Sequence, residues 1–363
     1  MSARRPSTTC IGSLPHHNVD AALEFSFRTG IPFLPQIPVR NPWEYMLPQA
    51  LENLPGLLSE SDGAIRLNAE VWQSRRSEFE KRLQAAFEKK GEALEPFEPG
   101  PSTSSAWQPF VWELSERKIA IAKVQIAGPL TCQWSLTYAG EASQETKTEI
   151  SAAIFKLVLA RSLAMVRRLK SQGIQPILYL DEPALYGLSM ANARHAMGLQ
   201  ELRLMVQTLR KEGSVVGLHC CSNTDWSAVL ALGVDFLSID VELSLQSLLE
   251  RTQALEAHLA SGGRLSLGVI PTARSSVLHS LDVAALFAKM LEAFGRSELG
   301  AKKPELVRKL LSEAVFTPAC GLALHSTADS EIVLGALIEF EERCHRSLQG
   351  VTRQSRPSSA GVH

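Results

Sequence analysis

The chain has 363 residues, of which 45% are hydrophobic, and its formal net charge is −1. This length can bury a large core, in one big α/β domain or in two smaller ones. The near-neutral charge gives no electrostatic reason to expect nucleic acid or an anionic membrane as a partner. No apolar run is long enough to span a bilayer, and the basic N-terminus lacks the apolar segment of a secretory signal.

The N-terminal third predicts two βα units followed by an insertion. A short strand ends at Ser13, and Asn18 can cap a helix that runs to about residue 29. Pro32–Pro38 can hold a second strand, although its prolines disfavour a regular ladder. Residues 55–109 then combine a charged helical piece with a loop rich in Pro, Ser and Glu, and we interpret them as an insertion rather than a second domain.

From residue 119 onwards, predicted strands and helices alternate regularly. The expected strands are 119–127, 176–181, 215–221, 234–240, 264–270 and 315–318, and the expected helices are 143–172, 191–211, 224–232, 244–261, 282–295, 304–314 and 329–347. Eight strands separated by helices favour parallel pairing and a (β/α)8 TIM barrel with an insertion after the second βα unit. A doubly wound sheet is the alternative, but no Gly-rich phosphate fingerprint follows the first strand.

We expect a single catalytic domain over residues 1–348 and a polar, disordered tail over residues 349–363. The six cysteines of this long chain, in the absence of a secretory signal, do not suggest a disulfide scaffold. They indicate a cytoplasmic protein with reduced thiols, some of which are candidates for metal binding or catalysis.

The strand over residues 215–221 ends in His219, Cys220 and Cys221. Because side chains alternate along a strand, His219 and Cys221 share one face and Cys220 lies on the other. An imidazole and a thiol at one strand end are typical of a zinc site. A buried thiol pair beside a core histidine explains this triplet alone equally well.

In a barrel the active site lies at the carboxyl ends of the strands, and further candidate ligands fall at those ends. Asp240 ends the next strand, Glu242 follows with the same parity, and Cys320 lies just past the last strand. One imidazole, two thiols and a carboxylate suit zinc. Ligands gathered from separate strands indicate a catalytic site with an exchangeable position rather than a structural knuckle.

Three other segments supply candidate substrate contacts. Asp181 and Glu182 follow an apolar strand, so one carboxylate there could bind an ammonium group or take a proton, or could cap a helix. Ser13, after Gly12, could bind a substrate carboxylate or belong to an ordinary turn. Trp134 could form the wall of a site for a flat ligand or pack in the core.

The order of these motifs resembles the C-terminal catalytic barrel of cobalamin-independent methionine synthase, which belongs to a superfamily with uroporphyrinogen decarboxylase. The matching motifs are Ile11-Gly12-Ser13-Leu14-Pro15, Gly128-Pro129-Leu130-Thr131 with Trp134-Ser135, Asp181-Glu182-Pro183-Ala184-Leu185, His219-Cys220-Cys221 and Pro318-Ala319-Cys320-Gly321-Leu322. They run over most of the chain, which resembles a standalone form of that catalytic core.

This resemblance implies a zinc ion (Zn2+) held by His219, Cys221 and Cys320, with Asp240 as fourth ligand and Glu242 as its substitute. In the family, zinc binds the acceptor thiol as a thiolate, which then attacks a methyl group. A metal lowers the pKa of a thiol, and the thiolate is the nucleophile, so the chemistry of these residue types is consistent with that role.

The resemblance also implies that Ser13 and Asp181 hold the amino-acid part of homocysteine, with Asp181 and His219 as the catalytic residues and Trp134 at the substrate. Three features depart from the family. The N-terminal barrel is missing, so the donor could be methyl-tetrahydrofolate or a methyl-corrinoid protein. Asp240 stands where the family has a longer glutamate, and residues 36–41 contain no acid where the family has a glutamate for the homocysteine amine.

The expected function is therefore a zinc-dependent S-methyltransferase acting on a zinc-activated thiol, with homocysteine as the leading acceptor and methionine as its product. Three alternatives remain open at this point. They are a methyltransferase for another thiol, a uroporphyrinogen decarboxylase-like enzyme without metal, and a non-catalytic zinc- or corrinoid-binding protein with a closed metal site.

Overall fold

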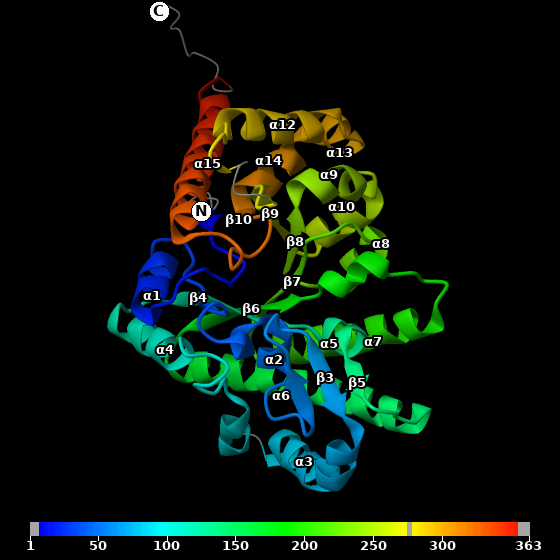
Figure 1. Ribbon diagram of the computed structural model, residues 1–363. Coiled ribbons are helices and arrows are strands. Elements are labelled where there is room, and N and C mark those ends of the chain that lie inside the picture. Colours follow the sequence, from blue (N-terminus) through cyan, green and yellow to red (C-terminus); the bar gives the residue numbers. More distant parts are fainter. Residues whose placement is uncertain (1–6, 90, 274–277, 355–363) are drawn as a thin grey trace, which may run out of the picture.

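Seven parallel strands form the main sheet of the computed structural model, which describes residues 7–89, 91–273 and 278–354. The strands lie in the order β1-β10-β9-β8-β7-β6-β4. Their bounds are β1 (Ser7–Thr8), β4 (Ile121–Ala127), β6 (Gln175–Asp181), β7 (Val215–Cys220), β8 (Phe236–Asp240), β9 (Arg264–Ile270) and β10 (Val315–Pro318). The sheet curls into a half-barrel (Figure 1), and its strands alternate with helices, so the predicted α/β class with parallel strands is confirmed.

The predicted second strand is a set of isolated contacts between the two edges of this sheet. Phe33 forms a single parallel bridge to Lys123 of β4, and Gln36 forms one to Ser13, beyond the end of β1. Its prolines remove backbone donors and so interrupt a continuous ladder. The described residues thus show a seven-stranded half-barrel, and the closed eight-stranded barrel stays a prediction.

Helices alternate with these strands along the chain. They are α1 (Val19–Phe27), α2 (Met46–Ala50), α4 (Trp107–Glu116), α5 (Pro129–Ser135), α6 (Gln144–Ser171), α7 (Ala193–Lys211), α8 (Trp226–Leu230), α9 (Val241–Leu249), α10 (Thr252–Ala260), α12 (Val283–Arg296), α13 (Glu298–Lys302), α14 (Pro304–Glu313) and α15 (Thr327–Gln354). Short 3-10 turns are η1 (Pro42–Glu44), η2 (Gly91–Phe97) and η3 (Pro183–Gly187). No helix in the described ranges is both long enough and apolar enough to cross a membrane.

Several predicted helix ends can be compared directly with the structure. Helix α1 begins after Asn18, whose side chain accepts a hydrogen bond from Ala21 N, as predicted. The single helix predicted over residues 244–261 is instead two helices, α9 and α10. Helix α15 continues to Gln354, past residue 349 where the tail was predicted to begin, and residues 355–363 of that tail lie outside the described residues.

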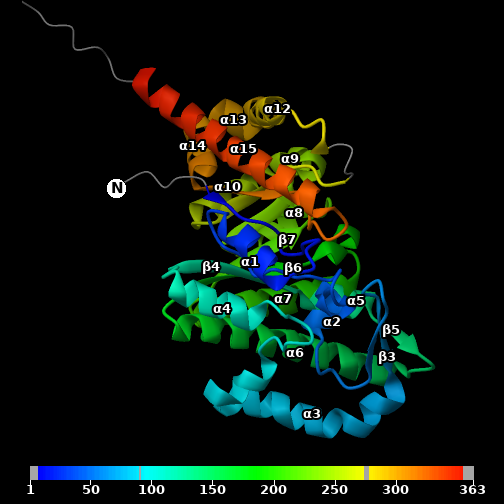
Figure 2. The ribbon, with the colours of Figure 1, turned by 60° about the vertical axis from the view of Figure 1, so that its left-hand side comes forward.

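The predicted insertion forms a small sheet and a long helix. Strands β2 (Leu57–Ser59) and β3 (Ile65–Asn68) are antiparallel, and β3 pairs in parallel with β5 (Thr137–Ala139). Helix α3 (Ala69–Lys89) corresponds to the charged helical piece. In Figures 1 and 2, α3 lies at one end of the molecule and α12 to α15 lie at the opposite end.

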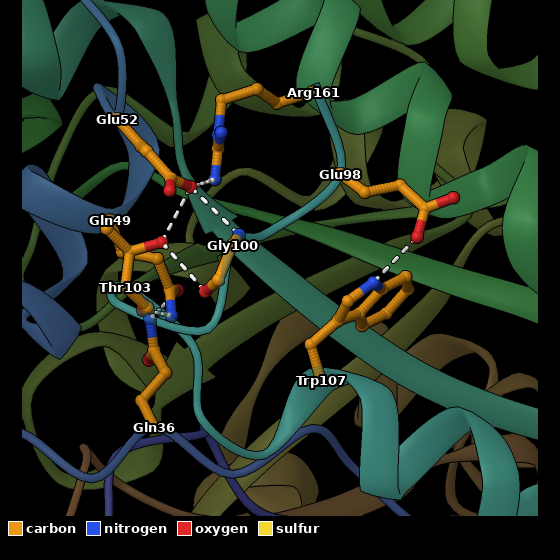
Figure 3. A network of polar contacts seen from close by, with 8 residues as sticks. All are labelled: Gln36, Gln49, Glu52, Glu98, Gly100, Thr103, Trp107 and Arg161. Carbon is orange, nitrogen blue, oxygen red and sulfur yellow. Dashed lines mark hydrogen bonds and ion pairs between the residues drawn. The ribbon is translucent and has the colours of Figure 1, made fainter. Parts of the chain in front are cut away.

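A buried set of hydrogen bonds, the anchor network (Gln49, Glu52, Gly100, Thr103 and Arg161), fastens the insertion to α6 (Figure 3). Glu52 Oε2 accepts from Arg161 Nη2 at 2.8 Å, from Thr103 Oγ1 at 2.6 Å and from Gly100 N at 3.0 Å. Arg161 is 1% exposed. A guanidinium buried this deeply needs an opposite charge, which Glu52 supplies.

The inner face of the curled sheet changes character along the strands. Its amino-terminal part is an apolar cluster made of Ile31, Ile177, Tyr179, Phe236 and Val315. Gly217 leaves room for Tyr179 here, because a Cβ at residue 217 would lie 2.5 Å from the Tyr179 ring. Two residues further along three of these strands, the same face carries Asp181, Ser238 and Thr317. Polar side chains therefore gather at the carboxyl ends, where the site was predicted.

Candidate functional site

Three inner-face side chains stand at one level on neighbouring strands. Asp181 of β6 is paired in register with His219 of β7, which is paired with Ser238 of β8. The exposed fractions of the three residues are 6%, 4% and 1%. Parallel pairing in this register thus brings the predicted residues Asp181 and His219 together and adds Ser238, which no sequence motif indicates.

The two ring nitrogens of His219 have different surroundings. Nδ1 lies 2.9 Å from Ser238 Oγ. Nε2 is buried and forms no hydrogen bond among the described residues, although the Cys221 thiol lies close enough to interact with the ring. A neutral imidazole offers one donor and one acceptor, and buried polar atoms in proteins are nearly always paired. The free nitrogen is therefore available to a ligand or a metal ion.

Cys221 lies beside this ring, and Cys320 contacts Cys221. Contact with the Cys320 thiol, and then with His219, lowers the pKa of Cys221, although burial acts in the opposite direction. The pKa of Cys320 is raised, chiefly because its thiol interacts with Cys221. Cys220 points into the core on the other face of β7, where burial raises its pKa to about 12. Alternation along the strand predicted this division of the two adjacent cysteines.

We call Asp181, His219, Cys221 and Cys320 the mouth group. In the described parts of the chain, no three His, Cys, Asp or Glu side chains converge closely enough to hold a metal ion as they stand. Coordination by His219, Cys221 and Cys320 would require at least one of these side chains to rotate. The donor set of one imidazole nitrogen and two thiols fits zinc, and the unpartnered, buried His219 Nε2 is an atom that a cation would satisfy.

The two predicted carboxylate ligands have different surroundings. Asp240 Oδ1 accepts hydrogen bonds from Glu242 N at 2.8 Å and Leu243 N at 3.2 Å, so Asp240 is the N-cap of α9. Burial raises the pKa of Asp240, and the charges of Glu242 and Cys221 add to this effect. The register that pairs Cys220 with Ile239 brings the following residues, Cys221 and Asp240, to neighbouring strand ends. Glu242 is exposed, and its Oε1 lies 3.6 Å from Lys289 Nζ. The structure therefore keeps Asp240 near the mouth group and directs Glu242 to the surface.

The carboxylates of the adjacent acids Asp181 and Glu182 have different surroundings. Asp181 Oδ1 is buried without a partner, and burial raises the pKa of Asp181 to about 6 despite His219 and Lys123 nearby. Glu182 is fully buried, and its carboxylate accepts from Leu130 N at 3.0 Å and Thr131 N at 2.7 Å. Burial raises the pKa of Glu182 to about 7.

Glu182 therefore caps the first turn of α5, the helix that carries Trp134. A Cβ at Gly128 would lie 2.1 Å from Glu182 Oε1, so glycine is required where the chain enters this helix. Capping was one of the roles predicted for this acid pair, but nothing in the sequence indicates that the second acid is the cap or that α5 is the capped helix.

Ser13 lies next to the loop that carries Cys320. Leu322 N donates to Ser13 O at 2.8 Å, and a Cβ at Gly321 would lie 2.0 Å from Ser13 Oγ. The segment before Ser13 is held by Lys123, whose Nζ donates to Ile11 O at 2.6 Å. Burial lowers the pKa of Lys123 to about 8. A lysine inside the apolar run of residues 121–127 was the sequence signal for this contact.

An acid does approach Ile37, although residues 36–41 contain none. Glu44 is 1% exposed, and its Oε2 accepts from Ile37 N at 3.0 Å. Its Oε1 accepts from Ser105 Oγ at 2.6 Å. Both oxygens thus hold the chain itself, so Glu44 fastens the insertion to the predicted second strand.

Trp134 lies at the wall of a hollow of about 870 Å³ that also includes Ala184, just after the Asp181–Glu182 pair. The Trp134 ring faces the His195 ring, with centroids 4.5 Å apart. On the same wall, Lys147 Nζ lies 5.4 Å from the centre of the Tyr138 ring. Aromatic faces together with positive charge suit a flat ligand that carries an anionic group.

Comparisons with known proteins give a likeness of fold. No protein-family model matches the chain, and no curated protein matches its sequence. A methyltransferase from Methanosarcina mazei is similar in structure, with 15% sequence identity, a TM-score of 0.55 and coverage of 95% of each chain. A B12-independent methionine synthase from Shewanella sp. W3-18-1, in complex with selenomethionine, matches with 16% identity and a TM-score of 0.48 over 66% of this chain and 68% of that one.

At 15% identity, the match to the Methanosarcina protein shows a shared overall fold, and the match to the Shewanella protein is too weak to support an argument. The fold of this chain is thus of the α/β type found in that methyltransferase, with a curled parallel sheet.

Proposed function

We propose that this chain is a cytoplasmic, zinc-dependent S-methyltransferase of the cobalamin-independent methionine synthase type, with homocysteine as the leading acceptor. The observation that carries this proposal is the group of His219, Cys221 and Cys320 at the carboxyl ends of the strands, with a buried imidazole nitrogen that lacks a partner. The proposal includes closure of the (β/α)8 barrel by residues 31–36. Hydrogen bonds from Ile31 N to Thr8 O and from Leu34 N to Lys123 O, both 2.9 Å, support this closure.

In this proposal His219, Cys221 and Cys320 hold the metal, and Asp240 completes the set while still capping α9. Zinc bound there would keep an acceptor thiol deprotonated at neutral pH. We assign binding of the amino-acid part of the acceptor to two other residues. Asp181 would accept a hydrogen bond from the ammonium group through its unpartnered Oδ1, and Ser13 would donate to the carboxylate.

The hollow beside Trp134 is the proposed site of the methyl donor. A pterin ring could stack on Trp134, and Lys147 and Arg194 in the same wall would attract the carboxylates of a folate. These features favour methyl-tetrahydrofolate over a methyl-corrinoid protein as the donor. Ala184, in the wall of this hollow, follows Asp181 of the mouth group closely in the chain.

The proposal is tested by zinc analysis of the purified protein and its cysteine variants. We expect about one zinc per wild-type chain, and we expect C221S and C320S to lose both zinc and methyl transfer. The matched control is C220A, because Cys220 is adjacent but faces the core, and this variant should keep its zinc. Full zinc content in both C221S and C320S would contradict the ligand assignment.

One observation favours a second candidate, a uroporphyrinogen decarboxylase-like enzyme that works without metal, because no three candidate ligands converge in the described residues. That candidate predicts no zinc and an activity that survives C221S. Cobalt substitution distinguishes both from a non-catalytic, closed metal site. If homocysteine reaches the metal, adding it should change the thiolate charge-transfer bands, whereas a closed four-ligand site should not respond.

A further inference from the structure

We propose that Ser238 is a positioning residue, which fixes the tautomer and orientation of the His219 ring and thereby sets the metal affinity of the site. This inference rests on the proposed function, because it concerns the same metal. It assigns a role to a residue that neither its sequence context nor any motif indicates.

The inference rests on two observations about the His219 ring. One ring nitrogen is in contact with Ser238, and the other has no hydrogen-bond partner. His219 Nδ1 lies 2.9 Å from Ser238 Oγ, and both residues are buried. His219 Nε2, on the opposite side of the ring, is buried and has no partner among the described residues. The two Cα atoms are paired in register between β7 and β8, so the backbone ladder holds the contact in place.

The contact determines which nitrogen is free to bind a metal. If the Nδ1 proton is donated to Ser238 Oγ, the lone pair of the neutral ring lies on Nε2. Metal-binding histidines are commonly oriented in this way by an acceptor on their other nitrogen, and loss of that acceptor costs about 10–100-fold in metal affinity. A serine hydroxyl is a weaker acceptor than a carboxylate, so the expected loss is near the lower end, about tenfold.

The neighbouring strand supplies a matched control. Ser266 of β9 is paired in register with Ser238, is equally buried, and has its hydroxyl bonded to the Tyr179 hydroxyl instead of the His219 ring. Replacing either serine by alanine removes the same atom from the same level of the sheet. Only S238A removes an acceptor from the proposed ligand.

The experiment compares wild type, S238A, S238T and S266A as full-length chains, after circular dichroism has shown that each is folded. The zinc dissociation constant is measured by competition with a chromophoric chelator. We expect S238A to bind zinc about tenfold more weakly, with S238T, which keeps a hydroxyl, and S266A close to wild type. If S238A does not fold, S238V, which has the shape of S238T but no hydroxyl, takes its place.

A second readout reports the tautomer directly. With 15N-labelled histidine and H219Q to assign the signals, two-bond 15N–1H correlation spectra should show His219 protonated on Nδ1 in the metal-free wild type. In S238A the signals should indicate a mixture of tautomers, and in S266A they should not change. A purely structural role for Ser238 would alter stability without altering this pattern.

The outcomes separate the two proposals. If the wild type binds zinc but S238A binds it equally well and keeps the Nδ1–H tautomer, the role of Ser238 is disproved and the proposed function stands. If the wild type binds no zinc, the proposed function fails, and this inference fails with it.

Discussion

The anchor network and the Asp181–His219 part of the mouth group are both buried and polar, but the chain pairs their hydrogen-bonding atoms differently. In the anchor network, Glu52 Oε2 accepts three hydrogen bonds, although Nε and Nη1 of Arg161 lack partners. In the mouth group, Asp181 Oδ1 and His219 Nε2 are buried without partners. The carboxylate of the anchor network is thus paired by the chain itself, whereas the carboxylate of the mouth group keeps a buried oxygen that suits a ligand.

Burial alone therefore does not identify a functional site. Arg161 and Glu52 lie far apart in the sequence, and their pairing fastens the insertion to α6. Asp181 and His219 lie on adjacent strands, and each keeps one buried atom without a partner among the described residues. Mutations should therefore affect stability in the first region and ligand binding in the second.

The largest expected effect on stability tests the anchor network. E52A leaves Arg161 buried without its carboxylate, and we expect it to lower the free energy of unfolding by about 3–5 kcal/mol. Urea denaturation followed by tryptophan fluorescence measures this change, while zinc affinity of the folded protein should stay the same.

The control is E60A, which removes the ion pair of Glu60 with Arg66, two exposed residues, and should cost less than about 1 kcal/mol. The comparison between the two regions breaks down if E52A costs no more than E60A, or if it lowers zinc affinity as strongly as C221S does.

The next effect concerns Lys123, a buried cation whose hydrogen bonds go to the neutral oxygens Ile11 O and Gln125 Oε1. Burial lowers the pKa of Lys123 from 10.5 to about 8. Between these values the unfolded chain holds a proton that the folded chain has lost. Stability should therefore rise with pH from about 8 to about 10.5, with roughly 3 kcal/mol contributed by this one group.

K123M removes this titration and therefore isolates it. Urea unfolding of wild type and K123M at pH 7.5 and pH 10.5 gives the difference in unfolding free energy at each pH. We expect the difference to move by roughly 3 kcal/mol in favour of the wild type at the higher pH. Differences that are equal at the two pH values would show that Lys123 keeps its charge when buried.

The smallest expected effect on stability concerns Asp240, which belongs to the fold as a cap and to the proposed site as a ligand. D240A should cost about 1 kcal/mol through the lost cap of α9. D240S keeps a good capping residue, so its stability should stay close to wild type, but a serine cannot replace a carboxylate on zinc. We therefore expect weaker zinc binding in both variants.

E242Q is the control for D240A and D240S, because Glu242 is exposed and meets only Lys289 among the contacts described here. It should leave zinc affinity unchanged and should change the free energy of unfolding by less than about 1 kcal/mol. Unchanged zinc affinity in D240S would remove Asp240 from the ligand set, and weaker zinc binding in E242Q would restore Glu242 as the substitute.

Much of the element order followed from local sequence patterns. Buried apolar runs predicted the strands from residue 119 onwards, and Asn18 predicted the start of α1. Alternation along β7 assigned Cys221 to the inner face and Cys220 to the core. These features depend on residues close in the chain, so periodicity and capping are enough to predict them.

Only the tertiary structure decided which polar groups meet. Glu182 caps α5, Glu44 reaches Ile37 and Ser238 contacts His219 because separate segments are brought together by the pairing and curl of the sheet. Residues 31–36 illustrate the same limit. Their prolines disfavour a regular strand, and only the tertiary structure shows that this segment bridges the two edges of the sheet. Sequence patterns set the face of each side chain, but its partners depend on strand register, which is fixed by packing across the whole molecule.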